Sequence, residues 1–395
     1  VGVRCDYAEA GVCRSCTRLS VAYPEQVATK AARAREALSP AAPGLGWLDP
    51  VTSAERGFRN KAKLVVGGSP SAPTLGILGP DGHGVDLRAC ALHEPAVAAA
   101  IPVVADAIAG WRLLPYDVPR RRGELKHVLL TGTPDGALML RFVLRGTHQL
   151  ARIREGLPRL RAALPGLAVV SVNLQPEHKA VLEGPTEIPL TESQTLRMPL
   201  GEVTLRLRPG SFFQTNTAVA HALYQQARAW ADLVEPASIL DLYCGAGGFA
   251  LFTAGPGREV RGVELSTEAV EGARASAGEL RARHPELGPV EFTAGDATAY
   301  ALGSATADRE PADHTAAGYL PDLVVVNPPR RGLDAALTDR LERSAVRHVV
   351  YSSCHLDTLA RDLARMPSLR AREARVFDMF PQTDHLEVMV LLSRD

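Results

Sequence analysis

Residues 238–249, which read SILDLYCGAGGF, decide the fold of this 395-residue chain. A short apolar run that ends in clustered glycines is typical of a parallel strand turning into a helix. Glycines let backbone amides approach a ligand, and a helix start favours an electronegative group. The spacing differs from the GxGxxG of dinucleotide-binding proteins. We therefore expect a nucleotide-like ligand here, with NAD binding or simple helix–strand packing as the alternatives.

Strands and helices alternate on the carboxyl side of this turn. The strand candidates are residues 238–243, 259–264, 290–294, 322–326, 348–352 and 387–392, and helical patterns separate the first several. Such alternation implies a mostly parallel sheet with right-handed crossovers. We predict a doubly wound, Rossmann-like α/β fold for residues 206–395, with residues 304–319 as a polar surface loop.

The amino half predicts an α+β domain built on antiparallel strands. Strands are expected at residues 126–131, 137–144, 167–174 and 203–207, and helices near 95–112 and at 149–164. We divide the chain into residues 1–95, a cysteine-rich region that begins the central α+β domain, residues 96–205, which complete that domain, and residues 206–395.

Composition narrows the class of protein. Lys plus Arg and Asp plus Glu both number 44, so no overall field draws the chain to nucleic acid or to anionic lipid. No apolar stretch approaches the roughly 20 residues that span a bilayer. We expect a cytoplasmic protein with no membrane and no obligate protein partner. Thiols stay reduced in that compartment, so six cysteines indicate metal binding or catalysis before disulfides.

Three polar residues follow predicted strands and could contact the ligand. Glu264 lies 19 residues beyond Gly245, where an acid can bind both ribose hydroxyls. Asp296 could meet an adenine amino group, or it could be a helix N-cap. Asn327 opens the run Asn-Pro-Pro, and two prolines make a rigid corner that presents its side chain.

Cys354 ends the apolar run that begins at residue 348, and Glu387 opens the last predicted strand. A pyrimidine C5 becomes nucleophilic when a thiolate adds at C6, and a base must later remove the C5 proton. A thiol and a carboxylate at one edge of the sheet would suit that chemistry. The alternatives are a small buried core residue for Cys354 and a water-facing acid on an edge strand for Glu387.

Together these strings resemble the RNA 5-methyluridine (uracil-C5) methyltransferases. The matching pieces are SFFQTN at 211–216, the Asp241 turn, NPPR at 327–330, SSC at 352–354 and the segment 378–387. The resemblance implies a class I S-adenosylmethionine (SAM) methyltransferase fold in the carboxyl half. It makes Cys354 the nucleophile and Glu387 the base. Its cofactor-binding positions fall on Gln214, Tyr243, Glu264 and Asn327, and the place of Asp296 after a predicted strand makes it a fifth candidate.

Four cysteines near the amino end form a candidate metal site. Cys5, Cys13 and Cys16 are close in sequence, and Cys90 is distant. From spacing alone, zinc and an iron–sulfur cluster fit equally. The resemblance favours a [4Fe–4S] cluster. It also favours the branch of the family that modifies 23S rRNA, the RlmC type.

Two basic strings could hold the RNA. They contribute seven cations in an otherwise balanced chain: Arg59, Lys61, Lys63, Arg120, Arg121, Arg122 and Lys126. Phosphate contacts dominate affinity for nucleic acid, so we expect these cations to line one groove facing Cys354; solvated strand faces and a loop are the alternative.

We therefore expect SAM-dependent methylation of a stem-loop uridine in 23S rRNA. The alternatives are a tRNA 5-methyluridine or amino-group methyltransferase, and a non-catalytic, metal-bearing RNA-binding protein.

Overall fold

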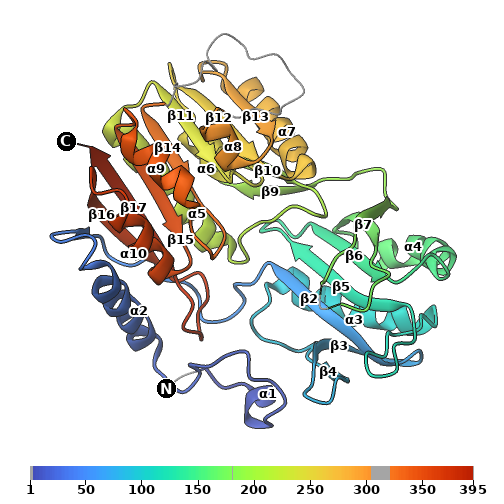
Figure 1. Ribbon diagram of the computed structural model, residues 1–395. Helices are drawn as coiled ribbons and strands as arrows, with labels where there is room; N and C mark the ends of the chain where they lie inside the picture. Colours follow the sequence, from blue (N-terminus) through green and yellow to red (C-terminus); the bar gives the residue numbers. More distant parts are fainter. Residues whose placement is uncertain (1–2, 180, 304–320, 395) are drawn as a thin grey trace. The chain divides into compact units, whose positions relative to one another are not determined.

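The computed structural model describes residues 3–179, 181–303 and 321–394, so the predicted loop at 304–319 lies outside the described residues. The chain forms two compact units (Figure 1). The carboxyl unit contains Thr17–Ser53 and Leu200–Asp395, and the amino unit contains Val3–Cys16 and Ala54–Pro199. Among the described residues, no helix is both long and apolar enough to cross a membrane.

An eight-stranded sheet forms the centre of the carboxyl unit. Its strands are β1 (Gly46–Trp47), β11 (Ser238–Leu242), β12 (Glu259–Glu264), β13 (Val290–Ala294), β14 (Leu323–Val326), β15 (His348–Ser353), β16 (Leu369–Phe377) and β17 (Glu387–Arg394). Their order is β1-β16-β17-β15-β14-β11-β12-β13. β17 runs antiparallel to both neighbours, and the other pairs are parallel. The six predicted strands are all present.

β16 was not predicted from the sequence, because arginines and a glutamate interrupt its apolar residues. Only Leu369, Ala374, Val376 and Phe377 of this strand are buried. The segment is a strand because it pairs with β17, and its own sequence pattern does not predict that pairing.

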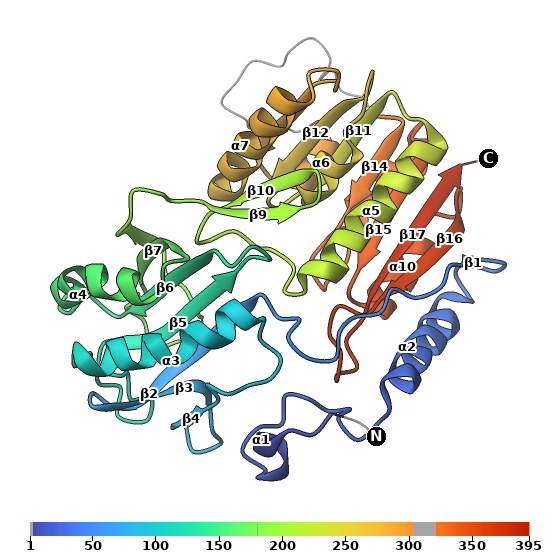
Figure 2. The ribbon, with the colours of Figure 1, turned by 180° about the vertical axis from the view of Figure 1, so that it is seen from behind.

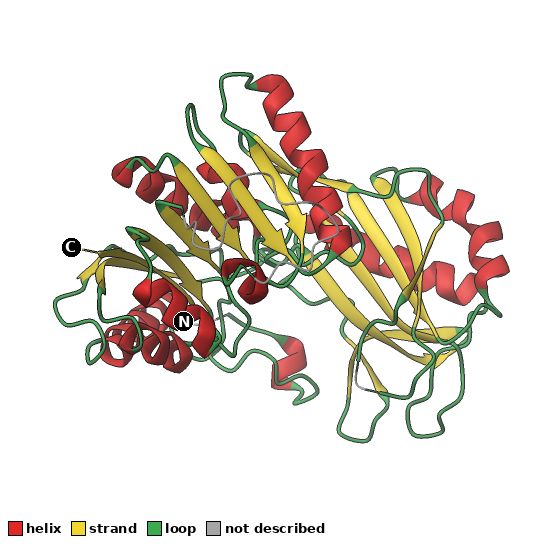
Figure 3. Ribbon diagram, turned by 45° about the horizontal axis from the view of Figure 1, so that its top comes forward, coloured by secondary structure: helices red, strands yellow, loops and turns green. Residues whose placement is uncertain are grey.

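Helices cover both faces of this sheet (Figures 1 and 2). On one face lie α2 (Tyr23–Leu38), α8 (Ala297–Ala301), α9 (Ala335–Arg343) and α10 (Leu356–Ala364), whose apolar side chains share one core with the sheet. On the other lie α5 (Thr217–Val234), α6 (Gly248–Thr253) and α7 (Thr267–Arg283). Figure 3 shows the strands lying between these two helical layers. The predicted doubly wound arrangement is therefore confirmed.

The helix α2 belongs to the carboxyl unit, although it lies near the amino end of the chain. Ala31, Ala34 and Leu38 recur at helical spacing and pack into the core of the eight-stranded sheet. Burial of that apolar stripe, rather than position along the chain, decides where the segment belongs. The compact units therefore divide the chain differently from the consecutive segments expected from sequence.

The amino unit contains a seven-stranded sheet in the order β4-β3-β2-β5-β6-β7-β8. These strands are β2 (Lys61–Ser69), β3 (Ala72–Leu78), β4 (Gly84–Asp86), β5 (Leu125–Gly132), β6 (Leu138–Leu144), β7 (Leu167–Leu174) and β8 (Thr186–Pro189). The helices α3 (Pro95–Gly110) and α4 (Leu150–Ala163) share one core with the sheet. The expected α+β domain is present, but β6 and β7 pair in parallel because α4 connects them.

The remaining elements are short. The helix α1 (Asp6–Glu9) follows Cys5, and β9 (Leu196–Leu200) pairs with β10 (Val203–Leu207) where the chain leaves the amino unit. β10 packs on α7, where the Arg206 amide donates to the Ser276 hydroxyl at 2.8 Å.

Candidate active site

One pocket of about 660 Å³ in the carboxyl unit gathers the predicted site residues. Its lining includes all seven: Gln214, Tyr243, Glu264, Asp296, Asn327, Cys354 and Glu387. The cause is topological. The chain runs from β11 to β12 and β13 in one direction and then returns to β14 and β15 on the other side of β11. Ligands bind in open α/β sheets at such a switch point, beyond the carboxyl ends of the strands.

The turn after β11 presents bare backbone to this pocket. Tyr243 adopts a left-handed conformation with φ of +62°. At Gly245, also left-handed, a Cβ would meet no atom within 4 Å, so a ligand can approach the backbone. At Gly247, a Cβ would lie 2.7 Å from the Phe292 ring. The glycines therefore serve both ligand approach and helix packing.

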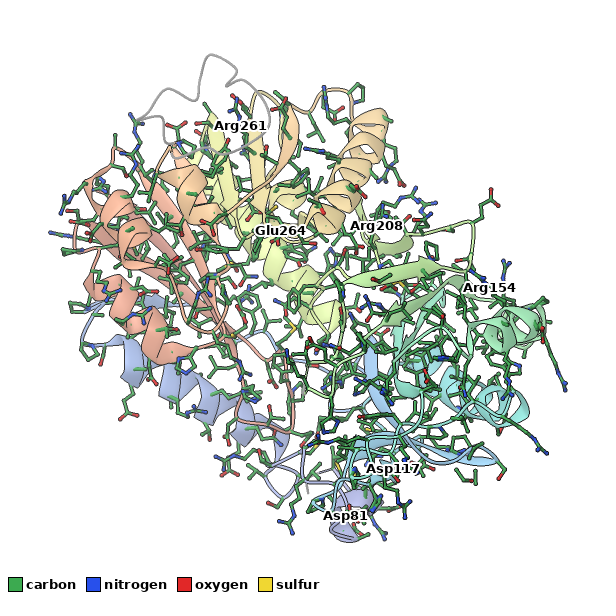
Figure 4. All side chains as sticks on the ribbon, turned by 45° about the vertical axis from the view of Figure 1, so that its right-hand side comes forward. Asp81, Asp117, Arg154, Arg208, Arg261 and Glu264 are labelled. Carbon is green, nitrogen blue, oxygen red and sulfur yellow. The ribbon has the colours of Figure 1, made fainter. Side chains whose placement is uncertain are left out.

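Glu264, the last residue of β12, lies beside this turn (Figure 4). Its carboxylate accepts hydrogen bonds from the Gly245 amide at 3.1 Å and the Ser266 amide at 2.9 Å. These bonds orient the acid while it lines the pocket. A ribose diol is the kind of group that an acid at this position binds.

Asp296 caps a helix, which is the structural role that we gave as the alternative to ligand binding. It is the N-cap of α8, and its Oδ1 accepts from the Ala299 amide at 2.8 Å. It also lines the pocket. Capping therefore fixes the side chain without removing it from the site.

Gln214 and Asn327 approach the pocket from two further segments. Gln214 is buried and lies two residues before Asn216, the N-cap of α5. Asn327 follows β14 directly, where Pro328 and Pro329 end the strand. Both side chains carry an amide, which can donate and accept hydrogen bonds.

Cys354 follows β15 directly and is half-buried in the pocket wall. Burial, and then the Glu387 carboxylate, raise the pKa of its thiol. The Arg330 guanidinium, within hydrogen-bonding reach of the sulfur, opposes that rise. Cys354 is thus a pocket thiol with an acid and a cation beside it, not a residue enclosed in the core.

Glu387 is buried, and the Ser352 hydroxyl donates to its Oε1 at 2.6 Å. Burial raises the pKa of this carboxyl to about 7, although the Ser352 hydrogen bond works in the other direction. The interpretation as a water-facing acid on an edge strand is wrong, because β17 lies between β15 and β16. The register that pairs Ser353 with Val388 sets Glu387 beside Cys354.

A second pocket of about 590 Å³ shares Cys354, Arg330 and His385 with the first. The thiol therefore faces two adjoining spaces.

Sequence reasoning left several pocket residues without a role. Phe212 lines the first pocket with 66% of its surface exposed, and Phe380 and His385 line it together. The rings of Phe380 and His385 meet edge to face, with centroids 6.0 Å apart. Phe212 and Phe380 both lie in strings that carried the family resemblance, which was the available signal.

The four amino-end cysteines are free thiols, each half-buried, in the amino unit. The Tyr7 hydroxyl accepts from the Ala89 amide at 3.1 Å and so joins the loops that carry Cys5 and Cys90. Burial, and then the neighbouring Cys90, Cys13 and Cys5 thiols, raise the pKa of Cys16 to about 11. Across the described ranges, however, no group of three or more His, Cys, Asp or Glu is arranged to hold a metal ion.

The two basic strings divide by exposure. Arg120, Arg121 and Arg122 are exposed in the loop before β5. Lys126 is buried and donates to the Glu177 carbonyl, so its expected role as a phosphate-facing cation is wrong.

Arg59 and Lys61 are half-buried. Burial lowers the pKa of Lys61 to about 8 and lowers that of Arg59, which lies near Cys90 and Cys16. That the other six cations line one groove with Cys354 stays a prediction.

Known proteins resemble the chain over its whole length. The family described as tRNA (uracil-5-)-methyltransferase matches residues 191–395, more than half of the chain. The 23S rRNA (uracil(747)-C(5))-methyltransferase RlmC of Serratia proteamaculans is 44% identical over 100% of both chains. The enzyme of the same name from Yersinia pseudotuberculosis is 45% identical over 99% of each.

A solved structure has the same fold. It is the tRNA (uracil-54, C5)-methyltransferase of Pyrococcus abyssi in complex with S-adenosyl-L-homocysteine, with a TM-score of 0.75 and 25% identity. The match covers 96% of this chain and 84% of that one. The sheet and its switch point are therefore those of a class I methyltransferase, and the chain belongs to the RNA uracil-5-methyltransferase family.

Proposed function

We propose that this protein transfers a methyl group from SAM to C5 of a uridine in 23S rRNA. One observation carries the proposal: a thiol, Cys354, and a buried carboxylate, Glu387, line the same pocket as the residues suited to a nucleoside cofactor. The curated relatives, named for uridine 747 of 23S rRNA, make that nucleotide the first target to test.

The residues at the switch point fit SAM. Gly245 leaves its backbone open to a ligand, and Glu264 is held by two amides beside it. When bound, SAM supplies an electrophilic methyl group. Glu264 would bind the ribose hydroxyls, Asp296 the adenine amino group, and Tyr243, Gln214 and Asn327 the remaining surface of the cofactor.

The chain's own residues would carry the covalent steps. The Cys354 thiolate adds to C6 of uracil, and the electron pair of the C5=C6 bond moves toward C5 and the O4 carbonyl. C5 then takes the methyl group. The Glu387 carboxylate removes the C5 proton, the C5=C6 bond re-forms, and the thiolate leaves C6 with its electron pair. Arg330 would stabilise the thiolate before attack and after release.

The substrate is tested by offering equal concentrations of a 23S rRNA fragment and a tRNA transcript with labelled SAM. We expect methyl transfer to the 23S fragment, and we expect mapping of 5-methyluridine to find it at uridine 747. A fragment in which that uridine is replaced by cytidine is the control. Faster methylation of the tRNA would instead favour the alternative tRNA enzyme, whose solved relative has the same fold.

The exposed arginines give a prediction for RNA binding. Replacing Arg120, Arg121 and Arg122 with alanine should make the plot of log affinity against log salt shallower by about 2 to 3, the effect of losing three phosphate contacts. Arg154, Arg159 and Arg161 on α4 are also exposed, so their triple alanine variant is a control of equal charge. An unchanged salt slope in the first variant would contradict this role.

We also propose that Cys5, Cys13, Cys16 and Cys90 hold a [4Fe–4S] cluster in a cytoplasmic protein. Four soft thiol donors from two joined loops support it, as does the lack of any disulfide among the described cysteines. The cluster would fold or position the amino unit and take no part in methyl transfer. Protein purified without oxygen should be brown and contain about four irons per chain. A colourless protein with one zinc would show the other metal that suits four thiolates.

A further inference from the structure

The loop of residues 378–386 joins β16 to β17 and bounds the active pocket. We call it the rim loop. It contributes Phe380 and His385 to the pocket wall and leads directly into Glu387. Its backbone lies outside the sheet, so its polar groups must find partners elsewhere.

Three of those partners lie on α2. The Gln382 amide donates to Oε1 of Gln26 at 3.0 Å, and Nζ of Lys30 donates to the Phe380 carbonyl at 3.0 Å. The Arg33 guanidinium donates to the Asp384 carbonyl, also at 3.0 Å. The three α2 residues are spaced at i, i+4 and i+7, so they form one polar face of the helix. We call this set the α2 seam.

The centre of the α2 seam is a buried ion pair. Nζ of Lys30 lies 2.6 Å from the Asp378 carboxylate, with 3% and 1% of the two side chains exposed. Burial lowers the pKa of Lys30, and Asp378 opposes that effect. Replacing a buried pair with packed apolar residues is often neutral or stabilising. Stability alone therefore does not account for a charge here, whereas fixing one loop conformation does.

The rim loop also holds a strained residue in its middle. Gln382 is fully buried and left-handed, with φ of +66°, and it is not a glycine. Such a conformation persists only where the surroundings over-determine it. The Gln26 side chain supplies that constraint through two hydrogen bonds. Its Oε1 accepts from the Gln382 backbone amide, and its Nε2 donates to the Gln382 side-chain Oε1 at 2.9 Å.

We propose that the α2 seam is a positioning device for catalysis, which holds the rim loop so that Phe380 and His385 shape the pocket around Cys354. Gln26 and Lys30 line neither pocket, so they act through the loop and not on the substrate. The proposal rests on the proposed methyl transfer for its kinetic consequences, but its structural part stands on the seam itself.

The test compares four variants of the full chain. Lys30→Met breaks the seam, and Lys30→Arg keeps its charge. K30M/D378L replaces the buried pair with apolar residues. Trp230→Phe is the matched control, because it removes a hydrogen bond to Glu373 of β16, at 2.6 Å, without touching the rim loop. Each is measured for thermal midpoint, for hydrogen–deuterium exchange of residues 378–386, for S-adenosylhomocysteine binding and for kcat and KM.

For K30M/D378L, we expect a wild-type thermal midpoint, rim-loop exchange about tenfold faster, and kcat about 10- to 100-fold lower. Affinity for S-adenosylhomocysteine should be unchanged, because β11, β12 and β13 carry the proposed ribose and adenine contacts. Lys30→Arg should recover most of the kcat, and Trp230→Phe should alter neither exchange nor kcat.

Either of two results would overturn the proposal: wild-type kcat in K30M/D378L, or unchanged exchange of residues 378–386 in both Lys30→Met and that double variant. If the wild-type protein methylates no RNA, the proposed function fails instead. The exchange measurement then still decides whether the seam holds the loop.

Discussion

Cys354→Ala should abolish methylation of RNA, with a loss in kcat of about 10⁴-fold or more, because Cys354 is the one thiol among the described residues that line the pocket. The variant should still fold and bind S-adenosylhomocysteine, since the cofactor contacts come from other strands. The loss therefore belongs to chemistry and not to binding.

The measurement is trapping with 5-fluorouridine RNA. A base can remove a proton from C5 but cannot remove a fluorine there, so the last step of the reaction is blocked. Wild-type protein with SAM should therefore form a covalent complex that survives denaturation. Cys354→Ala should form none. A wild-type protein that binds this RNA but forms no covalent complex would favour the non-catalytic RNA-binding protein.

Glu387→Gln should slow turnover by about 10²- to 10⁴-fold, the usual contribution of a general base. It differs from Cys354→Ala in where the reaction stops. Glutamine cannot take the C5 proton, so Cys354 stays bonded to the methylated base. A covalent protein–RNA complex should therefore accumulate on unmodified RNA. Glu291→Gln, an exposed acid on β13, is the matched control and should accumulate none.

The pH dependence follows from the same two groups. Only the ionised Glu387 can accept a proton, and burial raises its pKa to about 7. The rate of product release should therefore rise as pH increases through about 7. The pKa of Cys354 is also raised, so its thiolate fraction grows at still higher pH. Single-turnover release measured from pH 6 to 9 should lose the inflection near 7 in Glu387→Gln; an inflection that persists would assign it to another group.

Most strands of the eight-stranded sheet could be predicted because the signal for each strand lies within its own few residues. Apolar runs such as residues 238–243 and 348–352 coincide with β11 and β15. β16 was missed, since its charged residues conceal a strand whose pairing with β17 supplies the evidence. α2 was placed with the wrong part of the chain because its partners lie more than 300 residues away, as in the contact of Lys30 with Asp378.

The candidate site divides in the same way. Glu264, Asn327 and Cys354 lie at the ends of predicted parallel strands, so we expected them at one edge of the sheet. Gln214 came from the family resemblance alone, and Asp296 proved to cap α8 while lining the pocket. The sequence around Lys126 does not predict that its side chain is buried. Its burial in the folded chain shows that it cannot face phosphate.

Local patterns along the chain are enough to predict the order of strands and helices and the polar residues at the strand ends, because both depend on neighbours a few positions apart. The tertiary structure places β17 antiparallel between β15 and β16, which brings Glu387 beside Cys354 and, by burial, raises the pKa of the Glu387 carboxyl. It alone joined α2 to the rim loop. Both outcomes depend on contacts between segments that are distant in sequence. Such contacts exclude water from the buried groups, and a local pattern of residues does not show which groups will be buried in this way.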